Sequence, residues 1–262
     1  MRLTPAEIDT HVDTFNRDGM VMLRGHFAPD VLAAWRTAFA PLLTAHIEAE
    51  KDAPNRGSHR HYVTLPFSGL FADPAIHADP DVLAIVERVA GADPVLCQLA
   101  TDTPLRGSDY QPWHRDTPPL FEEWGRETPA FQLAVNFALC EVTADNGPLE
   151  TTLGTHLLER NQALAQIESA PEAIKSVVMK LGDVLIRDVR QIHRGTPNRT
   201  DQARPMVVLG YSRRWLHRPE VNIRVPQQTW DQLPPRSQQL LRFNPIVADG
   251  DAALDNYRQF AY

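Results

Sequence analysis

Two kinds of hydrophobic pattern divide the chain near residue 93. Before that point, apolar residues recur every three to four positions, as in PDVLAAWRTAFAPLLTAHIEAEK, which is the spacing of amphipathic helices. Beyond it, short apolar or alternating runs such as FQLAVNFALCEVT are separated by Pro, Gly, Asn and Asp, which is typical of antiparallel strands. The pattern predicts a helical first third followed by a β-rich core.

The first predicted helix covers residues 4–18 and carries its own start and stop signals. Thr4 is a candidate N-cap, Pro5 takes the first helical position, and Glu7 follows the cap by three residues to complete a capping box. Gly19 stands where the helix should end, because glycine readily adopts the left-handed conformation that closes a helix. A short strand, MVMLRG, is expected directly after it.

Three further helices are expected from the same periodicity. The second covers residues 29–51, with Pro41 as the position of a bend or a break. The third covers residues 79–93 and begins at one of the two aspartates of DPD. The fourth, LLERNQALAQIESA at residues 157–170, interrupts the β region because its Leu and Ala positions recur with helical spacing.

Four longer strands are expected in the β region: residues 94–103, 131–143, 176–188 and 205–215. Most of the 22 prolines lie between these runs and none lies inside one, as paired strands require. The economical arrangement is a double antiparallel sheet or jelly roll, mainly β with flanking helices (α+β), in which the N-terminal helices pack on one face.

A single domain over residues 1–262 accounts for these elements, since no repeat, linker or low-complexity tract divides them. Residues 1–93 form its helical N-terminal part and residues 94–215 its jelly-roll core. Residues 216–262 form a C-terminal extension, which either wraps the core or contacts a partner.

Composition and charge narrow the class of protein. The chain has 262 residues, 43% hydrophobic residues and a net charge of −7, which suits a globular protein and argues against a nucleic-acid partner. No window approaches the roughly 18 apolar residues of a membrane span, so no membrane partner and a cytoplasmic location are expected. Cys97 and Cys140 lie inside apolar runs and are expected to be reduced.

The first candidate for chemistry is QPWHRDTPP, residues 111–119. If it ends a strand, His114 and Asp116 point to the same face and Arg115 points to the other. Such a pair alone is more often a surface charge cluster than half of a metal site. A second element is therefore needed to favour the metal interpretation.

The second element is DVLIRDVRQIHRGTPNRTDQAR, residues 183–204. His193 ends a strand-like run, and Arg204 lies where the next apolar strand begins, so neighbouring antiparallel strands would present both to one cavity. Two histidines and a carboxylate with open coordination positions form the facial triad of non-haem Fe(II) oxygenases. Arg204 would grip the carboxylate of a cosubstrate as a bidentate fork. A zinc hydrolase could use the same three ligands but leaves Arg204 unexplained.

The chain resembles the phytanoyl-CoA dioxygenase family of Fe(II)- and 2-oxoglutarate-dependent oxygenases. Three stretches carry the resemblance in the family's order: WHRD at 113–116, DNGPLETTLGTH at 145–156, and HRGTPNRTDQAR at 193–204. It implies a double-stranded β-helix, which is a cupin-like jelly roll. It also implies Fe(II), 2-oxoglutarate and O2 as cofactors and cosubstrates.

The resemblance also implies roles for individual residues. The metal ligands, which are also the catalytic residues, are His114, Asp116 and His193. The residues expected to bind 2-oxoglutarate are Arg204, Asn136, Gln98, and Thr196 in place of the serine that some members carry at the position of Gly195. The residues expected to contact substrate are His61, Arg106 and Trp124.

The expected reaction follows from the retained carboxylate. Halogenating relatives have a small residue in place of Asp116, so this chain is expected to hydroxylate, or otherwise oxidise, a C–H bond of a small or medium-sized metabolite, with release of succinate and CO2. The alternatives are a jelly-roll ligand-binding protein without turnover and the zinc hydrolase. The substrate and the oligomeric state stay open.

Overall fold

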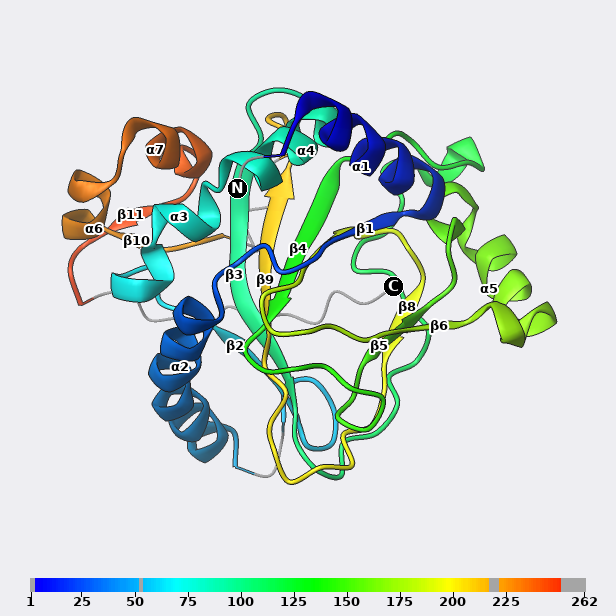
Figure 1. The fold of residues 1–262 in the computed structure, drawn as a ribbon, viewed down its shortest axis with the longest axis horizontal. Coiled ribbons are helices and arrows are strands. Elements are labelled where there is room, and N and C mark those ends of the chain that lie inside the picture. Colours follow the sequence, from blue (N-terminus) through cyan, green and yellow to red (C-terminus); the bar gives the residue numbers. More distant parts are fainter. Residues whose placement is uncertain (1–2, 52–53, 217–221, 251–262) are drawn as a thin grey trace.

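Two antiparallel sheets form the centre of the fold, with helices on the outer side of the larger one (Figure 1). The computed structural model describes residues 3–51, 54–216 and 222–250. Six strands form the larger sheet in the order β1-β7-β4-β9-β3-β2, and three form the smaller sheet in the order β6-β5-β8. Every pairing within these two sheets is antiparallel, as the sequence predicted.

The elements have the following bounds. The strands are β1 (Met20–Leu23), β2 (Arg60–Thr64), β3 (Val95–Pro104), β4 (Gln132–Ala138), β5 (Leu149–Thr151), β6 (Lys175–Val177), β7 (Val184–Asp188), β8 (His193–Gly195), β9 (Met206–Ser212), β10 (Val225–Pro226) and β11 (Ile246–Val247). The α-helices are α1 (Pro5–Asp18), α2 (Pro29–Glu50), α3 (Pro74–His77), α4 (Pro80–Ala90), α5 (Arg160–Ser169), α6 (Gln227–Gln232) and α7 (Pro235–Leu241). Short 3-10 turns are η1 (Gly69–Ala72), η2 (Glu122–Trp124), η3 (Thr155–Leu157) and η4 (Pro171–Ala173).

The larger sheet separates an apolar core from a cavity by strict alternation of its side chains. On β4, Leu133, Val135 and Phe137 belong to the main apolar cluster, which also contains residues of the helices. The residues between them, Ala134 and Asn136, face the cavity together with alternate residues of β7 and β9. The sequence of a strand that is buried on both faces is therefore a nearly continuous apolar run. The few polar residues within such a run face the cavity.

The N-terminal helices form as their local signals predicted. Thr4 accepts a hydrogen bond from the Glu7 backbone N–H and Glu7 accepts one from the Thr4 N–H, while Gly19 closes α1 with φ of 80°. Helix α2 continues through Pro41, so of the bend or break expected there, the break is absent. Its buried Trp35 ring lies 5.4 Å from the Phe137 ring of β4, which fixes α2 against the outer face of the sheet.

Two expectations are refined by the structure. The run 176–188, expected as one strand, forms β6 and β7 in different sheets, because a turn with Gly182 at φ of 103° separates them. In the C-terminal extension, Leu240 and Leu241 of α7 are fully buried in the main apolar cluster, so its described residues pack on the core. The remaining residues of this extension, 217–221 and 251–262, lie outside the described part.

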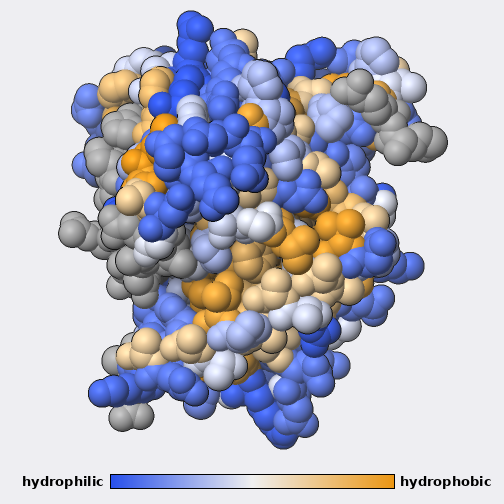
Figure 2. Space-filling model, turned by 90° about the vertical axis from the view of Figure 1, so that its left-hand side faces the viewer, coloured by the Kyte–Doolittle hydropathy of each residue, from blue (hydrophilic) through white to orange (hydrophobic). Residues whose placement is uncertain are grey.

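Figure 2 shows the side of the molecule on which α2, α3, α6 and α7 lie in Figure 1. An apolar band crosses this face between hydrophilic regions. Phe243 and Ile246, which follow α7 in the sequence, are exposed. Among the described residues, no helix combines the length and the apolar character that a membrane crossing requires. The cavity lies on the other side of the larger sheet.

Candidate metal centre and active site

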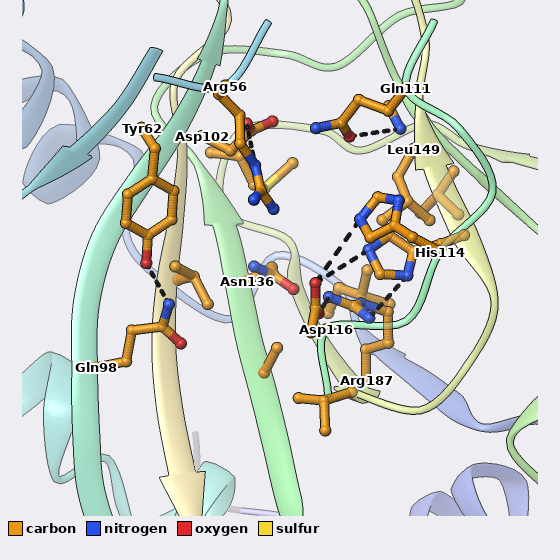
Figure 3. A pocket seen from close by; sticks show the side chains of 18 of the residues that line it. Arg56, Tyr62, Gln98, Asp102, Gln111, His114, Asp116, Asn136, Leu149 and Arg187 are labelled. Atoms are coloured by element: carbon orange, nitrogen blue, oxygen red, sulfur yellow. Dashed lines mark hydrogen bonds and ion pairs between the residues drawn. The ribbon is translucent and has the colours of Figure 1, made fainter. Parts of the chain in front are cut away.

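A cavity between the two sheets collects most of the polar side chains that interrupt the apolar strands (Figure 3). Strands β3, β4, β7 and β9 of the larger sheet line one side, and β5, β6 and β8 of the smaller sheet contribute to the other. The loop after β3 completes the lining with Gln111, His114 and Asp116.

The loop after β3 meets β8 through a backbone pair between the two candidate histidine ligands. The His114 N–H donates to the His193 carbonyl and the His193 N–H donates to the His114 carbonyl, both at 3.0 Å. The Asp116 N–H donates to the Val189 carbonyl at 2.9 Å. Arg115, between the ligands, turns away and pairs with Glu127 at 2.5 Å, as predicted, although the segment does not end a strand and only His114 forms an isolated bridge, with His193.

Backbone carbonyls orient both imidazoles toward the carboxylate. Nδ1 of His114 lies 2.8 Å from the Pro112 carbonyl, and Nδ1 of His193 lies 2.9 Å from the Gln191 carbonyl. Because a carbonyl only accepts, each Nδ1 carries the proton and each Nε2 presents a lone pair. The two Nε2 atoms lie 3.9 and 3.5 Å from Oδ1 of Asp116.

Arg187 of β7 holds the other oxygen of the Asp116 carboxylate. Its Nη2 donates to Oδ2 of Asp116 at 2.6 Å, and its Nη1 lies 3.3 Å from Nδ1 of His193. Arg187 is buried. Only Oδ1 of Asp116 is left facing the imidazoles, which suits monodentate ligation and leaves the remaining positions around an ion open.

The electrostatic environment sets the protonation that metal binding requires. Burial, followed by the neighbouring His193, lowers the pKa of His114 to about 3, so its imidazole is neutral at physiological pH. Burial alone would raise the pKa of Asp116, but Arg187 and the two imidazoles more than offset it and hold that pKa well below its ordinary value. Neutral imidazole and ionised carboxylate are the forms that bind a metal ion.

The three residues fit a divalent iron ion. One ligand atom from each lies within 4.8 Å of the others, so a small inward shift places all three around one ion. Nε2 of His114 is buried and has no hydrogen-bond partner among the described residues, a costly state unless another group binds it. Two imidazoles and one carboxylate on one side of a cavity form the donor set of non-haem iron sites.

Arg204 supplies a buried cation at a different place in the same cavity. Its guanidinium donates to the Gly147 carbonyl and lies 4.0 Å from the Asp102 carboxylate, while its Nε has no hydrogen-bond partner in the described part of the chain. Burial lowers the pKa of Arg204 to about 10, which still leaves it charged at neutral pH. A buried, incompletely paired guanidinium suits a carboxylate ligand.

Of the other residues predicted to bind 2-oxoglutarate, Asn136 and Gln98 line the cavity and Thr196 does not. Asn136 donates to the Val207 carbonyl at 3.3 Å, and Gln98 donates to the Tyr62 hydroxyl. Buried Thr196 donates to the Pro148 carbonyl at 2.8 Å, which directs its hydroxyl away from the cavity. The structure gives Thr196 no position from which to contact a cosubstrate there.

Gly195 shows why no side chain takes the place of the family serine. A Cβ at this position would lie 2.6 Å from Nη1 of Arg60 and 2.7 Å from Oε1 of Gln111. The Gly195 N–H donates to that same Gln111 oxygen at 2.9 Å. Arg60 and Gln111 therefore fill the space that a serine hydroxyl would occupy.

The three residues predicted to contact substrate lie outside the cavity lining. His61 is buried on β2 and pairs with Glu50 at 2.6 Å. Arg106 is exposed and pairs with Asp201, and the exposed Trp124 lies under the Arg126 guanidinium at 4.8 Å. A contact of these three with a substrate inside the cavity is therefore not supported.

Sequence reasoning missed several polar residues of the cavity, of which Arg187, Asp102 and Arg56 carry charge. Arg187 could have been found from VLIRD, because an arginine inside an apolar strand needs a buried partner. Asp102 could also have been found, because it lies four residues after Gln98 in an unbroken register of β3 and so shares its face.

A double sheet enclosing two histidines and one aspartate defines the class of cupin-like proteins with a facial metal site. The chain belongs to the phytanoyl-CoA dioxygenase family, whose family model matches residues 15–206. The family predicted from three short stretches is confirmed. Membership of this family supports the predicted enzyme class, a non-haem iron dioxygenase that uses 2-oxoglutarate.

One curated relative is the dioxygenase aneA of Aspergillus aculeatus. It is 27% identical over 153 residues, which are 56% of this chain and 50% of aneA. The chain therefore spans about half the length of this relative.

Solved structures with low sequence identity share the fold. HygX from Streptomyces hygroscopicus superposes with a TM-score of 0.62 at 17% identity, over 94% of this chain and 97% of HygX. The epimerase SnoN from nogalamycin biosynthesis gives a TM-score of 0.60 at 19% identity, over 80% of this chain and 84% of SnoN. AviO1 from Streptomyces viridochromogenes Tue57 gives 0.62 at 19% identity, over 82% and 99%. These similarities confirm the predicted double-stranded β-helix.

Proposed function

We propose that the chain is an Fe(II)- and 2-oxoglutarate-dependent dioxygenase that hydroxylates, or otherwise oxidises, a C–H bond of a small or medium-sized metabolite, releasing succinate and CO2. The observation that carries this proposal is the presence of His114, Asp116 and His193 in one cavity with the buried cation Arg204. A cytoplasmic location is part of the same proposal.

Structural neighbours support the identity of the cofactors. A structure of SnoN was solved with Fe3+, alpha-ketoglutarate and nogalamycin RO, and that of HygX with nickel, 2-oxoglutarate and hygromycin B. In this chain, His114, Asp116 and His193 would hold the iron, and Arg204 would bind the far carboxylate of 2-oxoglutarate. Bound iron supplies the oxygen and redox chemistry that protein side chains lack.

The charge of the cavity suits a divalent cation together with a dianion. Three arginines, Arg56, Arg187 and Arg204, and two aspartates, Asp102 and Asp116, line it, which leaves a net charge of one positive unit. A divalent metal and the doubly negative 2-oxoglutarate cancel each other and preserve that balance. Binding of both ligands therefore leaves the net charge of the cavity unchanged and requires no further buried ion.

The retained carboxylate favours oxygenation over halogenation. As a metal ligand, Asp116 would occupy through Oδ1 the position that a halide would need, and Arg187 donates to its other oxygen. Because SnoN is an epimerase and SnoK a carbocyclase, neighbours of this fold support more than one outcome of C–H oxidation. Hydroxylation is the simplest of these outcomes and the one we propose.

The two alternatives explain fewer of the observations. A zinc hydrolase could use the same three ligands but has no role for Arg204, which is buried in the same cavity. A ligand-binding protein without turnover has no need of a neutral His114 whose buried Nε2 lacks a partner among the described residues.

The test is anaerobic reconstitution with Fe(II), addition of 2-oxoglutarate, and an oxygen pulse with a panel of metabolites. We expect an Fe(II)-dependent visible charge-transfer band on addition of 2-oxoglutarate, and succinate after the oxygen pulse. Asp116→Ala should lose both. Absence of succinate with the whole panel, together with unchanged iron binding in Asp116→Ala, would overturn the proposal.

A further inference from the structure

A second cluster of two histidines and one carboxylate lies where the end of α2 meets β2. Nε2 of His46 is 3.1 Å from Oε1 of Glu50, and Nδ1 of His61 is 2.6 Å from Oε2 of the same carboxylate. One ligand atom from each residue lies within 4.8 Å of the others. All three side chains are largely buried, with 5 to 11% of their surfaces exposed.

The backbone places these three residues together for reasons that differ from those at the iron site. His46 and Glu50 are four residues apart in the last turns of α2, so they share one helical face. His61 comes from β2, whose residues pair with β3 in the register His61 to Thr103. The two imidazole rings stand edge to face with centroids 6.2 Å apart, and both contact the carboxylate of Glu50.

The chemistry of this donor set matches a divalent transition-metal ion. Imidazole nitrogens and carboxylate oxygens are among the ligands that proteins use for zinc, at about 2.0 to 2.2 Å from the ion. When both imidazoles are neutral, Glu50 brings one buried negative charge into the cluster, and a cation would neutralise it. We propose that His46, Glu50 and His61 form a second metal site, which binds Zn2+.

The surroundings of this cluster indicate a structural ion. None of its three residues lines the cavity that contains the iron ligands, so it has no substrate-sized space beside it there. Asn55 lies next to it: its N–H donates to Oε1 of Glu50 at 2.7 Å, and its side chain exchanges two hydrogen bonds of 2.8 Å with the backbone of Tyr62. An ion would join the end of α2 to β2.

This junction is adjacent to the cavity of the candidate iron site. Arg56, the residue after Asn55, and Tyr62, the residue after His61, both line the cavity of the candidate iron site. A bound ion would therefore hold two cavity residues through their immediate neighbours. It would stabilise the shape of the cavity entrance without contacting the substrate.

The experiment counts zinc bound by the full chain in a background that lacks the candidate iron site. Asp116→Asn with His193→Gln leaves His114 as the single imidazole of that site. Zinc equivalents are measured by equilibrium dialysis and elemental analysis. We expect two equivalents for the unaltered chain and one for the double variant, and at least a tenfold loss of the remaining affinity when His61→Gln is added.

The matched control is His59→Gln in the same double-variant background, because His59 is an exposed histidine two residues from His61. It should keep one zinc. No stoichiometric zinc in the double variant, or equal affinity with and without His61→Gln, would overturn the proposal. Should His61→Gln unfold by circular dichroism, the zinc anomalous signal in crystals of the double variant decides: density between Glu50 and the two imidazoles supports the site, and density elsewhere overturns it.

Discussion

Two clusters with the same kinds of side chain, two histidines and one carboxylate, differ in how their hydrogen bonds are used. At the candidate iron site, backbone carbonyls take both Nδ1 protons and Arg187 takes one carboxylate oxygen. At the junction of α2 and β2, both imidazoles bond directly to Glu50. In the first arrangement the imidazole lone pairs face a cavity. In the second, the imidazoles are paired with the carboxylate of their own cluster.

The difference shows that the types of ligand residue do not by themselves distinguish a catalytic metal site from a structural one. Catalytic sites keep open coordination positions, whereas structural sites are enclosed by protein groups. His114 and His193 line a cavity together with Arg204, and His46 and His61 do not. We therefore assign a catalytic or a structural role from two features: whether the ligands line a cavity, and which residues orient them.

The largest effect is expected from removing the carboxylate of the cavity site. Asp116→Ala should lower iron affinity by more than the roughly 10- to 100-fold typical of an outer-sphere change, because a direct ligand is lost and Arg187 is left unpaired. Iron binding followed by calorimetry checks this. Asp201→Ala, which removes an exposed carboxylate paired with Arg106, should bind iron as the unaltered chain does.

A change at Arg187 tests whether the orientation of the carboxylate matters. Arg187→Met should lower iron affinity by about 10- to 100-fold and shift the charge-transfer band formed with 2-oxoglutarate, because Asp116 loses the partner that fixes Oδ2. Arg187→Lys should restore part of both. An unchanged band in Arg187→Met would assign Arg187 a purely structural role.

Exchange of the buried guanidinium tests the cosubstrate end of the cavity. Arg204→Lys should raise the KM for 2-oxoglutarate by about 10-fold or more, since a point charge replaces a bidentate fork. Iron affinity without 2-oxoglutarate should change little, because Arg204 is not a ligand. Arg106→Lys, at an exposed arginine, is the control, and equal KM values for the two variants would contradict the assignment.

Another buried histidine, His77, sharpens the comparison because its ring pairs with a hydroxyl instead of a carboxylate. Nε2 of His77 lies 2.8 Å from Oγ of Ser237, and burial lowers the pKa of His77 to about 4. The unfolded chain, with a His pKa of about 6.5, binds more protons between these values, so stability falls as pH drops through this window. Between pH 7.5 and 5 the loss from His77 should be on the order of 2 kcal/mol.

Urea unfolding at the two pH values checks this expectation. His77→Gln removes the titrating group and should show a smaller loss of stability on acidification than the unaltered chain. Other groups titrate in both proteins, so their contributions cancel in the difference. Equal losses in the two proteins would mean that His77 does not titrate as its burial requires.

Much of the fold and part of the site followed from local spacing. The capping box at Thr4 and Glu7 formed as expected because its hydrogen bonds lie within one turn of helix. Arg115 turned away from His114 and Asp116 as predicted, although its segment is a loop with one isolated bridge. The roles of the metal ligands and of Arg204 stay predictions, and the structure places all four in one cavity.

The predictions for substrate contacts failed to find support because they depended on distant parts of the chain. His61 was expected to look into the cavity, but Glu50 at the end of α2 draws its ring to the other side of β2. Trp124 and Arg106 border the β region in sequence, yet their loops extend into solvent. Proximity in sequence to a ligand does not specify the direction of a loop.

Short-range patterns were sufficient for the helices, the alternating strands, the family and its ordered ligand stretches, because each depends on side chains a few residues apart. Tertiary structure alone decided that Arg187 meets Asp116, 71 residues away, and that His61 meets Glu50 across two elements. These contacts arise from sheet register and from the packing of α2 on the sheet. Both are set by the sum of many buried contacts, which no single stretch of sequence contains.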